Sequence, residues 1–438
     1  MGSGVVPIVQ DVQIARRVLA SLWHSRSTRR EVARRTSSAP KLRPRSIRIA
    51  VYFADADVNL YQIRQWYAPL AALSKLWPTA IISRSPGAAI ALMDEAPVPT
   101  VYLRLVDDLE SFLAEQDVRI VLYVNQNSRN FQMMRYSRMW HVFINHGESD
   151  KVYMTTNQYK AYDYSFVAGK AAIDRLSRKL WDFDIPKRVL EIGRPQTDHL
   201  GGSPPYEPDG RMVVLYAPTW EGDRAAAAYG SIASHGVTLV KALIVTGRHR
   251  VVYRPHPRSG VLDAAYRRAD ETIKAALAAA NASDPNAHHV VDSAAELGWQ
   301  LTSSDVAITD ISAMVYDRLA TGKPLVVTRP TSDVADVDES GFLGDADWLA
   351  ASDAGDVVAV LDRVAASEES QARLNRWVDW HFGDTTTGQS TARFHAAIER
   401  LMTEWDRHAT MHAHEPDGPD FSGNTDDDGD DEQVIRRR

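Results

Sequence analysis

The 438-residue sequence contains no cysteine. This absence excludes disulfide bonds, thiolate metal sites, iron–sulfur clusters and cysteine nucleophiles. Long apolar runs are also missing, so we expect no transmembrane helix. The phosphate-binding pattern G-x-x-x-x-G-K-[ST] and the nucleophile pattern G-x-S-x-G do not occur. No G-x-G-x-x-G follows a predicted strand, which disfavours a nicotinamide cofactor.

A strong excess of positive over negative charge is found in one segment near the start of the chain. Residues 16–48 contain eleven basic residues and one acid, whereas residues 415–438 contain nine acids and three arginines, in a chain of net charge −7. A nucleic-acid-binding protein usually carries its positive charge on the folded body, so we expect no nucleic-acid partner. We predict a basic amphipathic arm over residues 1–46 and a disordered acidic tail over residues 411–438.

The basic arm has two interpretations. Apolar residues recur at helical spacing between Val12 and Leu22, and a cluster of arginines follows them. A basic amphipathic helix can lie on an anionic membrane surface, which makes residues 12–46 a candidate membrane contact. The alternative is a solvated arm, or an arm docked on another protein.

Between the arm and the tail, short apolar runs alternate with helical patterns. Such alternation predicts parallel sheets with helices on both faces. We therefore expect an α/β fold with two Rossmann-like domains facing across a cleft. Their predicted bounds are residues 47–200 and 211–366, joined by a Gly/Pro-rich linker at 201–210 and followed by helices over 367–410. The predicted strands are residues 47–53, 118–124, 140–144, 164–168 and 189–193 in the first domain, and 212–216, 250–253, 289–291, 305–309 and 324–327 in the second.

A histidine follows the strand predicted at residues 140–144. His146 and Gly147 begin a polar loop there, and the glycine permits close backbone approach. An imidazole titrates near neutral pH, so His146 is a candidate general base for an attacking hydroxyl. The alternative is a loop histidine that is held only by hydrogen bonds.

Two strand ends in the second domain carry groups suited to phosphate. Arg254 and His256 alternate with prolines after one strand, and can donate to phosphate oxygens. Asp310 and Ser312 lie where another strand meets a helix, and backbone N–H groups at a helix start favour an anion. The alternatives are a rigid turn and an ordinary helix cap. Thr219 lies in a third such loop, whose chemistry the sequence does not specify.

The order of these segments resembles the CDP-glycerol glycerophosphotransferase family, the teichoic-acid primases and polymerases. The resemblance covers about residues 140–400, and no single motif in it is specific by itself. The matching segments are His146-Gly147, Tyr162-Asp163-Tyr164, Gly193-Arg194-Pro195-Gln196-Thr197-Asp198, Ala217-Pro218-Thr219-Trp220, Arg254-Pro255-His256-Pro257, Thr309-Asp310-Ile311-Ser312, Gly322-Lys323-Pro324 and Gly383-Asp384…Gly388…Ser390.

The resemblance implies a fold similar to GT-B glycosyltransferases and transfer of glycerol phosphate from CDP-glycerol to a hydroxyl, with release of CMP. It implies His146 as the base on the acceptor, and His256 as the group that stabilises the donor pyrophosphate or protonates the leaving CMP. Asp310, Ser312, Arg254 and Thr219 would line the donor site. The family's acceptor is lipid-linked, which fits a cytoplasmic enzyme at the inner face of the plasma membrane.

The sequence departs from the family pattern at two places. Glu148-Ser149-Asp150 stands where the family often has Thr-Pro, and we assign Glu148 and Lys151 to the acceptor side. Ile311 and Ala313 replace a tyrosine and a serine, so CDP-ribitol or another activated group remains an alternative donor. No carboxylate cluster of metal-binding type is obvious, so we name no metal ligands and expect no cofactor besides the donor substrate, while the sequence leaves the metal requirement open.

Two other functions remain open. The first is a GT-B glycosyltransferase or sugar-nucleotide epimerase that uses a different nucleotide donor. The second is a non-catalytic, envelope-associated binding protein whose function lies in the arm and the tail.

Overall fold

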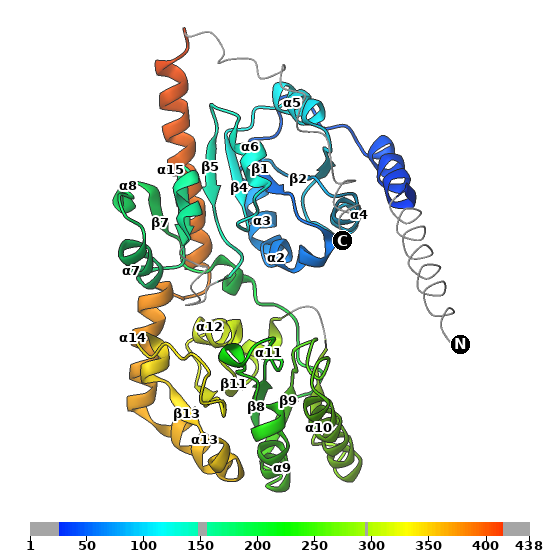
Figure 1. Ribbon diagram of the computed structural model, residues 1–438, viewed down its shortest axis with the longest axis vertical. Coiled ribbons are helices and arrows are strands. Elements are labelled where there is room, and N and C mark those ends of the chain that lie inside the picture. Colours follow the sequence, from blue (N-terminus) through cyan, green and yellow to red (C-terminus); the bar gives the residue numbers. More distant parts are fainter. Residues whose placement is uncertain (1–25, 148–155, 294–296, 415–438) are drawn as a thin grey trace, which may run out of the picture. The chain divides into compact units, whose positions relative to one another are not determined.

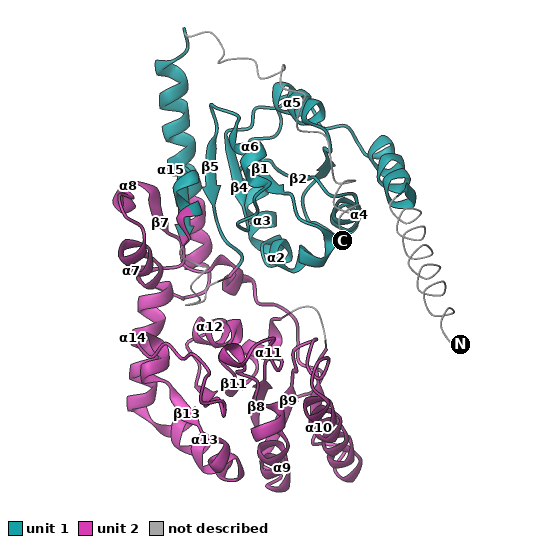
Figure 2. Ribbon diagram, in the orientation of Figure 1, with its two compact units in different colours: residues 1–146, 158–166, 397–438 teal, residues 147–157, 167–396 magenta. Residues whose placement is uncertain are grey.

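The computed structural model describes residues 26–147, 156–293 and 297–414 (Figure 1). The chain divides into two compact units (Figure 2). Unit 1 comprises residues 1–146, 158–166 and 397–438, and unit 2 comprises residues 147–157 and 167–396.

Unit 1 is built on a parallel sheet of short apolar strands. All five residues of β1 are buried, as expected for a strand covered on both faces. The seven strands lie in the order β3-β2-β1-β4-β5-β6-β7, and the last strand, β7, falls within unit 2. The strands are β1 (Ile49–Phe53), β2 (Thr79–Ser83), β3 (Thr100–Tyr102), β4 (Ile120–Tyr123), β5 (Trp140–Phe143), β6 (Tyr164–Val167) and β7 (Val189–Glu191).

Helices of unit 1 pack against this sheet. The C-terminal part of α15 is bonded to strands of this sheet: Trp140 Nε1 donates to the carbonyl of Leu401 at 3.1 Å, and the Tyr164 hydroxyl donates to Glu404 at 2.8 Å. The helices are α2 (Leu60–Arg64), α3 (Tyr67–Ser74), α4 (Pro86–Glu95), α5 (Val106–Glu115), α6 (Asn130–Met134) and α15 (Gln389–Met411), whose first residues belong to unit 2.

The described part of the basic arm docks on unit 1 itself. Residues 26–38 are helical, and Val32 of this helix is buried. Arg35 forms an ion pair with Asp94 on α4. Residues 12–25 of the predicted membrane contact lie outside the described residues, and so does the predicted tail from residue 415 onwards.

Unit 2 contains a six-stranded parallel sheet in the order β10-β9-β8-β11-β12-β13. Side chains alternate between its faces: Val214 and Tyr216 pack in one apolar core, and Val213 and Leu215 pack in the other. The strands are β8 (Met212–Ala217), β9 (His249–Tyr253), β10 (Val290–Val291), β11 (Val306–Thr309), β12 (Leu325–Thr328) and β13 (Asp347–Leu349).

Two groups of helices cover the two faces of this second sheet. The core that contains Tyr216 takes side chains from α9 (Val237–Val245), α10 (Ala264–Ser283) and α13 (Val357–Ala366). The core that contains Leu215 takes them from α11 (Trp299–Thr302), α12 (Ala313–Leu319) and α14 (Glu368–Phe382). Helices α7 (Lys170–Lys179) and α8 (Ile185–Arg188) complete the unit.

The predicted α/β fold with two parallel sheets is confirmed, and the chain after residue 367 forms helices α14 and α15. The domain boundary near residue 200 stays a prediction: strand order groups β7 with the first sheet, whereas the compact units assign residues 167–396 to unit 2. A search of the described residues for a helix long and apolar enough to cross a lipid bilayer found none.

Candidate active site

The four predicted donor-binding residues and the candidate catalytic residue His256 lie at one edge of the second sheet. Thr219 follows β8, Arg254 and His256 follow β9, and Asp310 and Ser312 follow β11. These three strands are neighbours and run parallel, so their carboxyl ends reach the same edge. This edge is where ligands bind in open α/β sheets.

Asp310 is buried beneath this edge and binds backbone groups of the loops that form it. Its side chain is 0% exposed, and Oδ2 accepts hydrogen bonds from the backbone N–H groups of Thr219 at 2.8 Å and Ser231 at 3.0 Å. Oδ1 accepts the hydroxyl proton of Thr328 at 2.5 Å. Asp310 therefore holds the loop after β8 in place, and we assign it a positioning role.

This buried carboxyl group predicts a pH-dependent stability. Burial raises the pKa of Asp310 from 3.8 to about 6, although the hydrogen bonds from Ser231, Thr328 and Thr219 oppose the shift. A raised pKa in the folded state means that this group stabilises the fold fully below pH 3.8, and that the contribution is lost as the pH rises through about 6.

An asparagine at this position satisfies the same neighbours without titrating. Its oxygen can accept from Thr219 and Ser231, and its NH₂ group can donate to the Thr328 hydroxyl. We expect the unfolding free energy of Asp310→Asn, relative to the wild type, to rise by about 3 kcal/mol between about pH 4 and pH 7. Urea unfolding across this range measures the difference, and a difference that is constant with pH contradicts the assignment.

Ser312 and Arg254 each have a bonding partner within unit 2. The Ser312 hydroxyl oxygen accepts the N–H of Met314 at 3.2 Å and caps the start of α12. The Arg254 guanidinium forms an ion pair with Asp292, which also accepts a hydrogen bond from Gln300 at 2.7 Å. The carboxylate and the amide thereby fix the direction of the Arg254 side chain.

His256 has a defined protonation pattern. Its Nδ1 accepts the backbone N–H of Arg258 at 3.1 Å, so a neutral His256 carries its proton on Nε2. The ring stacks on Trp220 with a centroid distance of 6.4 Å, and the Arg258 guanidinium lies 3.9 Å from the Trp220 ring centroid. His256 can therefore offer Nε2–H to an oxygen that gains negative charge.

Glu221 joins the loops after β8 and β9, a role that the sequence analysis missed. The carboxylate accepts three backbone N–H groups: those of Gly260 at 2.9 Å, Leu262 at 2.7 Å and Asp263 at 3.0 Å. Burial alone would raise the pKa of Glu221, but backbone hydrogen bonds lower it below the usual value. An ionised Glu221 thus clamps the loop that carries His256.

His146 lies in unit 1, at the end of β5. Its Nδ1 lies 3.0 Å from the carbonyl oxygen of Val124, and a carbonyl oxygen only accepts, so Nδ1 carries the proton. A neutral His146 then has its basic lone pair on Nε2. Asn145 adopts a left-handed conformation (φ 55°), and its Oδ1 accepts the backbone N–H of His146 at 2.9 Å. Glu148 and Lys151 lie outside the described residues.

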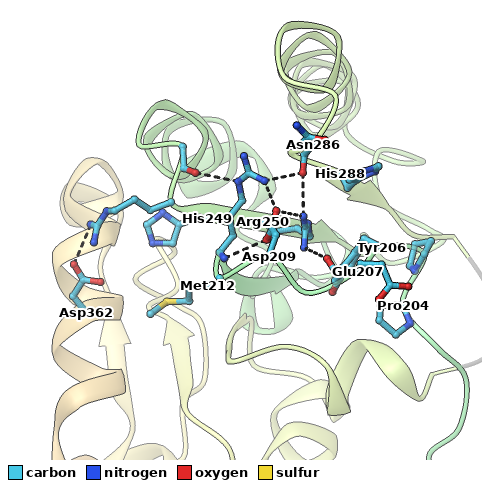
Figure 3. A pocket seen from close by; sticks show the side chains of 15 residues that line it. Pro204, Tyr206, Glu207, Asp209, Met212, His249, Arg250, Asn286, His288 and Asp362 are labelled. Carbon is cyan, nitrogen blue, oxygen red and sulfur yellow. Dashed lines mark hydrogen bonds and ion pairs between the residues drawn. The ribbon is translucent and has the colours of Figure 1, made fainter.

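A cavity of about 1150 Å³ lies at the opposite, amino-terminal edge of the second sheet (Figure 3). Arg211 and Arg250 line it, but internal partners hold both. Arg250 donates to Asp209 and to the carbonyl of Ala287, both at 2.8 Å, and Arg211 donates to Asp284 at 2.7 Å. These contacts fasten the linker after residue 200 to the sheet, and the candidate donor residues lie at the other edge.

Metal-binding groups were sought among the described residues. No cluster of three or more histidine, aspartate or glutamate side chains there is arranged to hold a metal ion.

Known proteins share the fold and the sequence pattern. A family model described as CDP-glycerol:poly(glycerophosphate) glycerophosphotransferase matches residues 140–399. The wall teichoic acid polymerase TagF is similar with a TM-score of 0.52 and 14% identity, over 92% of this chain and 100% of that chain. A putative UDP-N-acetylglucosamine 2-epimerase from Listeria monocytogenes has a TM-score of 0.51 and 15% identity, over 82% and 97%.

Another UDP-N-acetylglucosamine 2-epimerase has a TM-score of 0.52 and 13% identity, over 85% of this chain and 99% of that chain. Identities this low show the fold alone. A search of curated proteins found no match. The family model is the stronger finding, because it spans more than half of the chain and includes His146, His256 and the donor-site residues. The chain therefore belongs to the CDP-glycerol:poly(glycerophosphate) glycerophosphotransferase family and is an enzyme of that class.

Proposed function

We propose that the chain transfers glycerol phosphate from CDP-glycerol to a hydroxyl group of a cell-envelope polymer such as teichoic acid, and releases CMP. The observation that carries this proposal is the family match over residues 140–399, which includes both candidate histidines. The hydrogen bonds of the two rings support it, because they leave a basic nitrogen on His146 and an N–H donor on His256.

Each histidine has its own role in the proposed reaction. The acceptor oxygen attacks the phosphorus that bears glycerol, and the bond from that phosphorus to the bridging oxygen of CMP breaks. The hydroxyl proton passes to Nε2 of His146, and the electron pair of the broken bond stays on the CMP oxygen. His256 stabilises that oxygen through Nε2–H, and Arg254 adds positive charge at the donor.

Supporting residues keep the donor loops in place. Asp310 and Glu221 bind backbone N–H groups of the loops that carry Thr219 and His256. Such pre-organisation lowers the cost of orienting the pyrophosphate for in-line attack. Glu148 and Lys151 are proposed to lie on the acceptor side.

We further propose a lipid-linked acceptor and a peripheral position at the inner face of the plasma membrane. The basic arm supports this proposal, since Arg26 and Arg30 of its helical part are exposed to solvent. Basic residues near an anionic lipid surface are each worth roughly 1 kcal/mol of attraction.

A donor panel tests the function. The full chain is incubated with a lipid-linked acceptor and CDP-glycerol, CDP-ribitol or UDP-N-acetylglucosamine, and the released nucleotides are separated by chromatography. We expect CMP from CDP-glycerol in the presence of acceptor, and little product from the other two donors. CMP release from CDP-ribitol but not from CDP-glycerol would correct the donor. UDP release would support a glycosyltransferase, and conversion of the UDP-sugar into its epimer without UDP release would support an epimerase.

A further inference from the structure

A second polar cluster surrounds the candidate base in unit 1. Asp55 follows β1, Asn125 follows β4 and His146 follows β5, and these three strands are adjacent in the sheet. Asp55 and Asn125 precede the residues that the family model matches. The sequence analysis did not single out either of them.

Hydrogen bonds join this cluster into one network. The Asn125 amide donates to Oδ2 of Asp55 and to Oε1 of Gln62, both at 2.6 Å. Asn59 donates to the other oxygen of Asp55 at 3.0 Å. Asp55 and Gln62 are each partly exposed, so one side of the network remains open to solvent.

The network lies next to His146. The Nδ1–H of His146 donates to the carbonyl of Val124, the residue directly before Asn125. Tyr61, the neighbour of Gln62 on α2, meets the His146 ring edge-on at a centroid distance of 6.0 Å. Two independent contacts therefore place the cluster beside the imidazole.

Acceptor atoms outnumber donors in this cluster. Asn125 is only 6% exposed, and its buried Oδ1 accepts no hydrogen bond from the described residues. Within the described residues, each Asp55 oxygen accepts one hydrogen bond although a carboxylate oxygen can accept two, and no cation there forms an ion pair with Asp55. Surplus acceptors favour a ligand that donates hydroxyl protons, and an unneutralised carboxylate disfavours a phosphate.

We propose that Asp55, Gln62 and Asn125 form a subsite for a neutral polyol, which binds the hydroxyl-bearing end unit of the acceptor. This identification of the ligand rests on the proposed function. Binding a neighbouring hydroxyl here orients the attacking hydroxyl towards Nε2 of His146. The phosphodiester part of the acceptor binds elsewhere, away from the Asp55 carboxylate.

A binding experiment without nucleotide tests the subsite. The probe is glycerophosphoglycerol, and its binding to the full chain is followed by saturation-transfer NMR. We expect Asn125→Ala and Asp55→Asn each to weaken binding about 10-fold or more, since each leaves buried polar atoms without partners. Glycerol should displace the probe, whereas inorganic phosphate at the same concentration should not.

Gln116→Ala is the matched control, because Gln116 is a buried amide of unit 1 that accepts from Ser46 and Ile47 before β1. It should unfold more easily but bind the probe like the wild type. Asp55→Asn preserves the shape of the side chain, so it remains informative if Asn125→Ala does not fold. Unchanged binding in folded Asp55→Asn and Asn125→Ala, no binding to the wild type, or displacement by phosphate overturns the subsite. CMP release from CDP-glycerol is measured separately and decides the proposed function.

Discussion

Replacing His146 with alanine is expected to lower kcat by about 100- to 10,000-fold, the usual contribution of a positioned general base. The physical reason is the proton on Nδ1, which the Val124 carbonyl holds and which leaves Nε2 as the basic atom. Without the imidazole, the acceptor hydroxyl must lose its proton to water. Single-turnover measurements with saturating CDP-glycerol and acceptor report this step directly.

The affinity for the donor separates catalysis from binding. His146 lies in unit 1, whereas the candidate donor residues lie in unit 2, so the Kd for CDP should stay within about twofold in the variant. His412→Ala, at an exposed position directly after the end of α15, is the control and should keep wild-type kcat. Near-normal turnover in His146→Ala would remove this residue from the mechanism.

The second large effect concerns the clamp that Glu221 places on the His256 loop. His256→Ala should lower kcat about 100- to 1,000-fold, the range found when one donor to a developing negative charge is removed. Glu221→Ala releases three backbone N–H groups of the same loop and should lower kcat by about 10-fold or more through the displaced imidazole.

A double-mutant cycle tests whether Glu221 acts through His256. If it does, the double variant loses no more activity than His256→Ala alone, because the clamp then has no imidazole to hold. Independent effects would multiply instead, and that result would contradict the positioning role. Glu271→Ala, on the exposed surface of α10, is the matched control for the loss of a carboxylate.

Sequence patterns predicted the central strands other than β2, and also the short edge strands β7 and β10, but missed β2, β3 and β13. Strands β3 and β13 have three residues each and lie at sheet edges, where a strand leaves only a short local pattern. Strand β2 is apolar throughout but was not separated from its surroundings. Residues 60–74 form two helices instead of one, with an interruption after Arg64, since Pro69 cannot donate to the carbonyl of Gln65 in a continuous helix.

In the candidate site, the positions of the residues at strand ends were predictable from the sequence, whereas their contacts were not. The sequence placed Thr219, His256 and Asp310 at strand ends, and adjacent parallel strands bring those ends together. The burial of Asp310 and the clamp of Glu221 depend on contacts between distant segments, such as the bond from Gly260 to Glu221. Which ring nitrogen of His146 carries the proton also depends on a tertiary partner, the carbonyl of Val124, which no local pattern encodes.

The central claim is that the proposed transfer needs both histidines, His146 as the base on the acceptor hydroxyl and His256 as the donor of a hydrogen bond to a phosphate oxygen. A crystal structure of the full chain with CDP-glycerol and glycerophosphoglycerol tests it most directly. We predict Nε2 of His256 within about 3 Å of a donor phosphate oxygen, and Nε2 of His146 within about 3 Å of an acceptor hydroxyl that faces the same donor. A bound donor with either imidazole turned away and out of reach of both substrates would contradict the account.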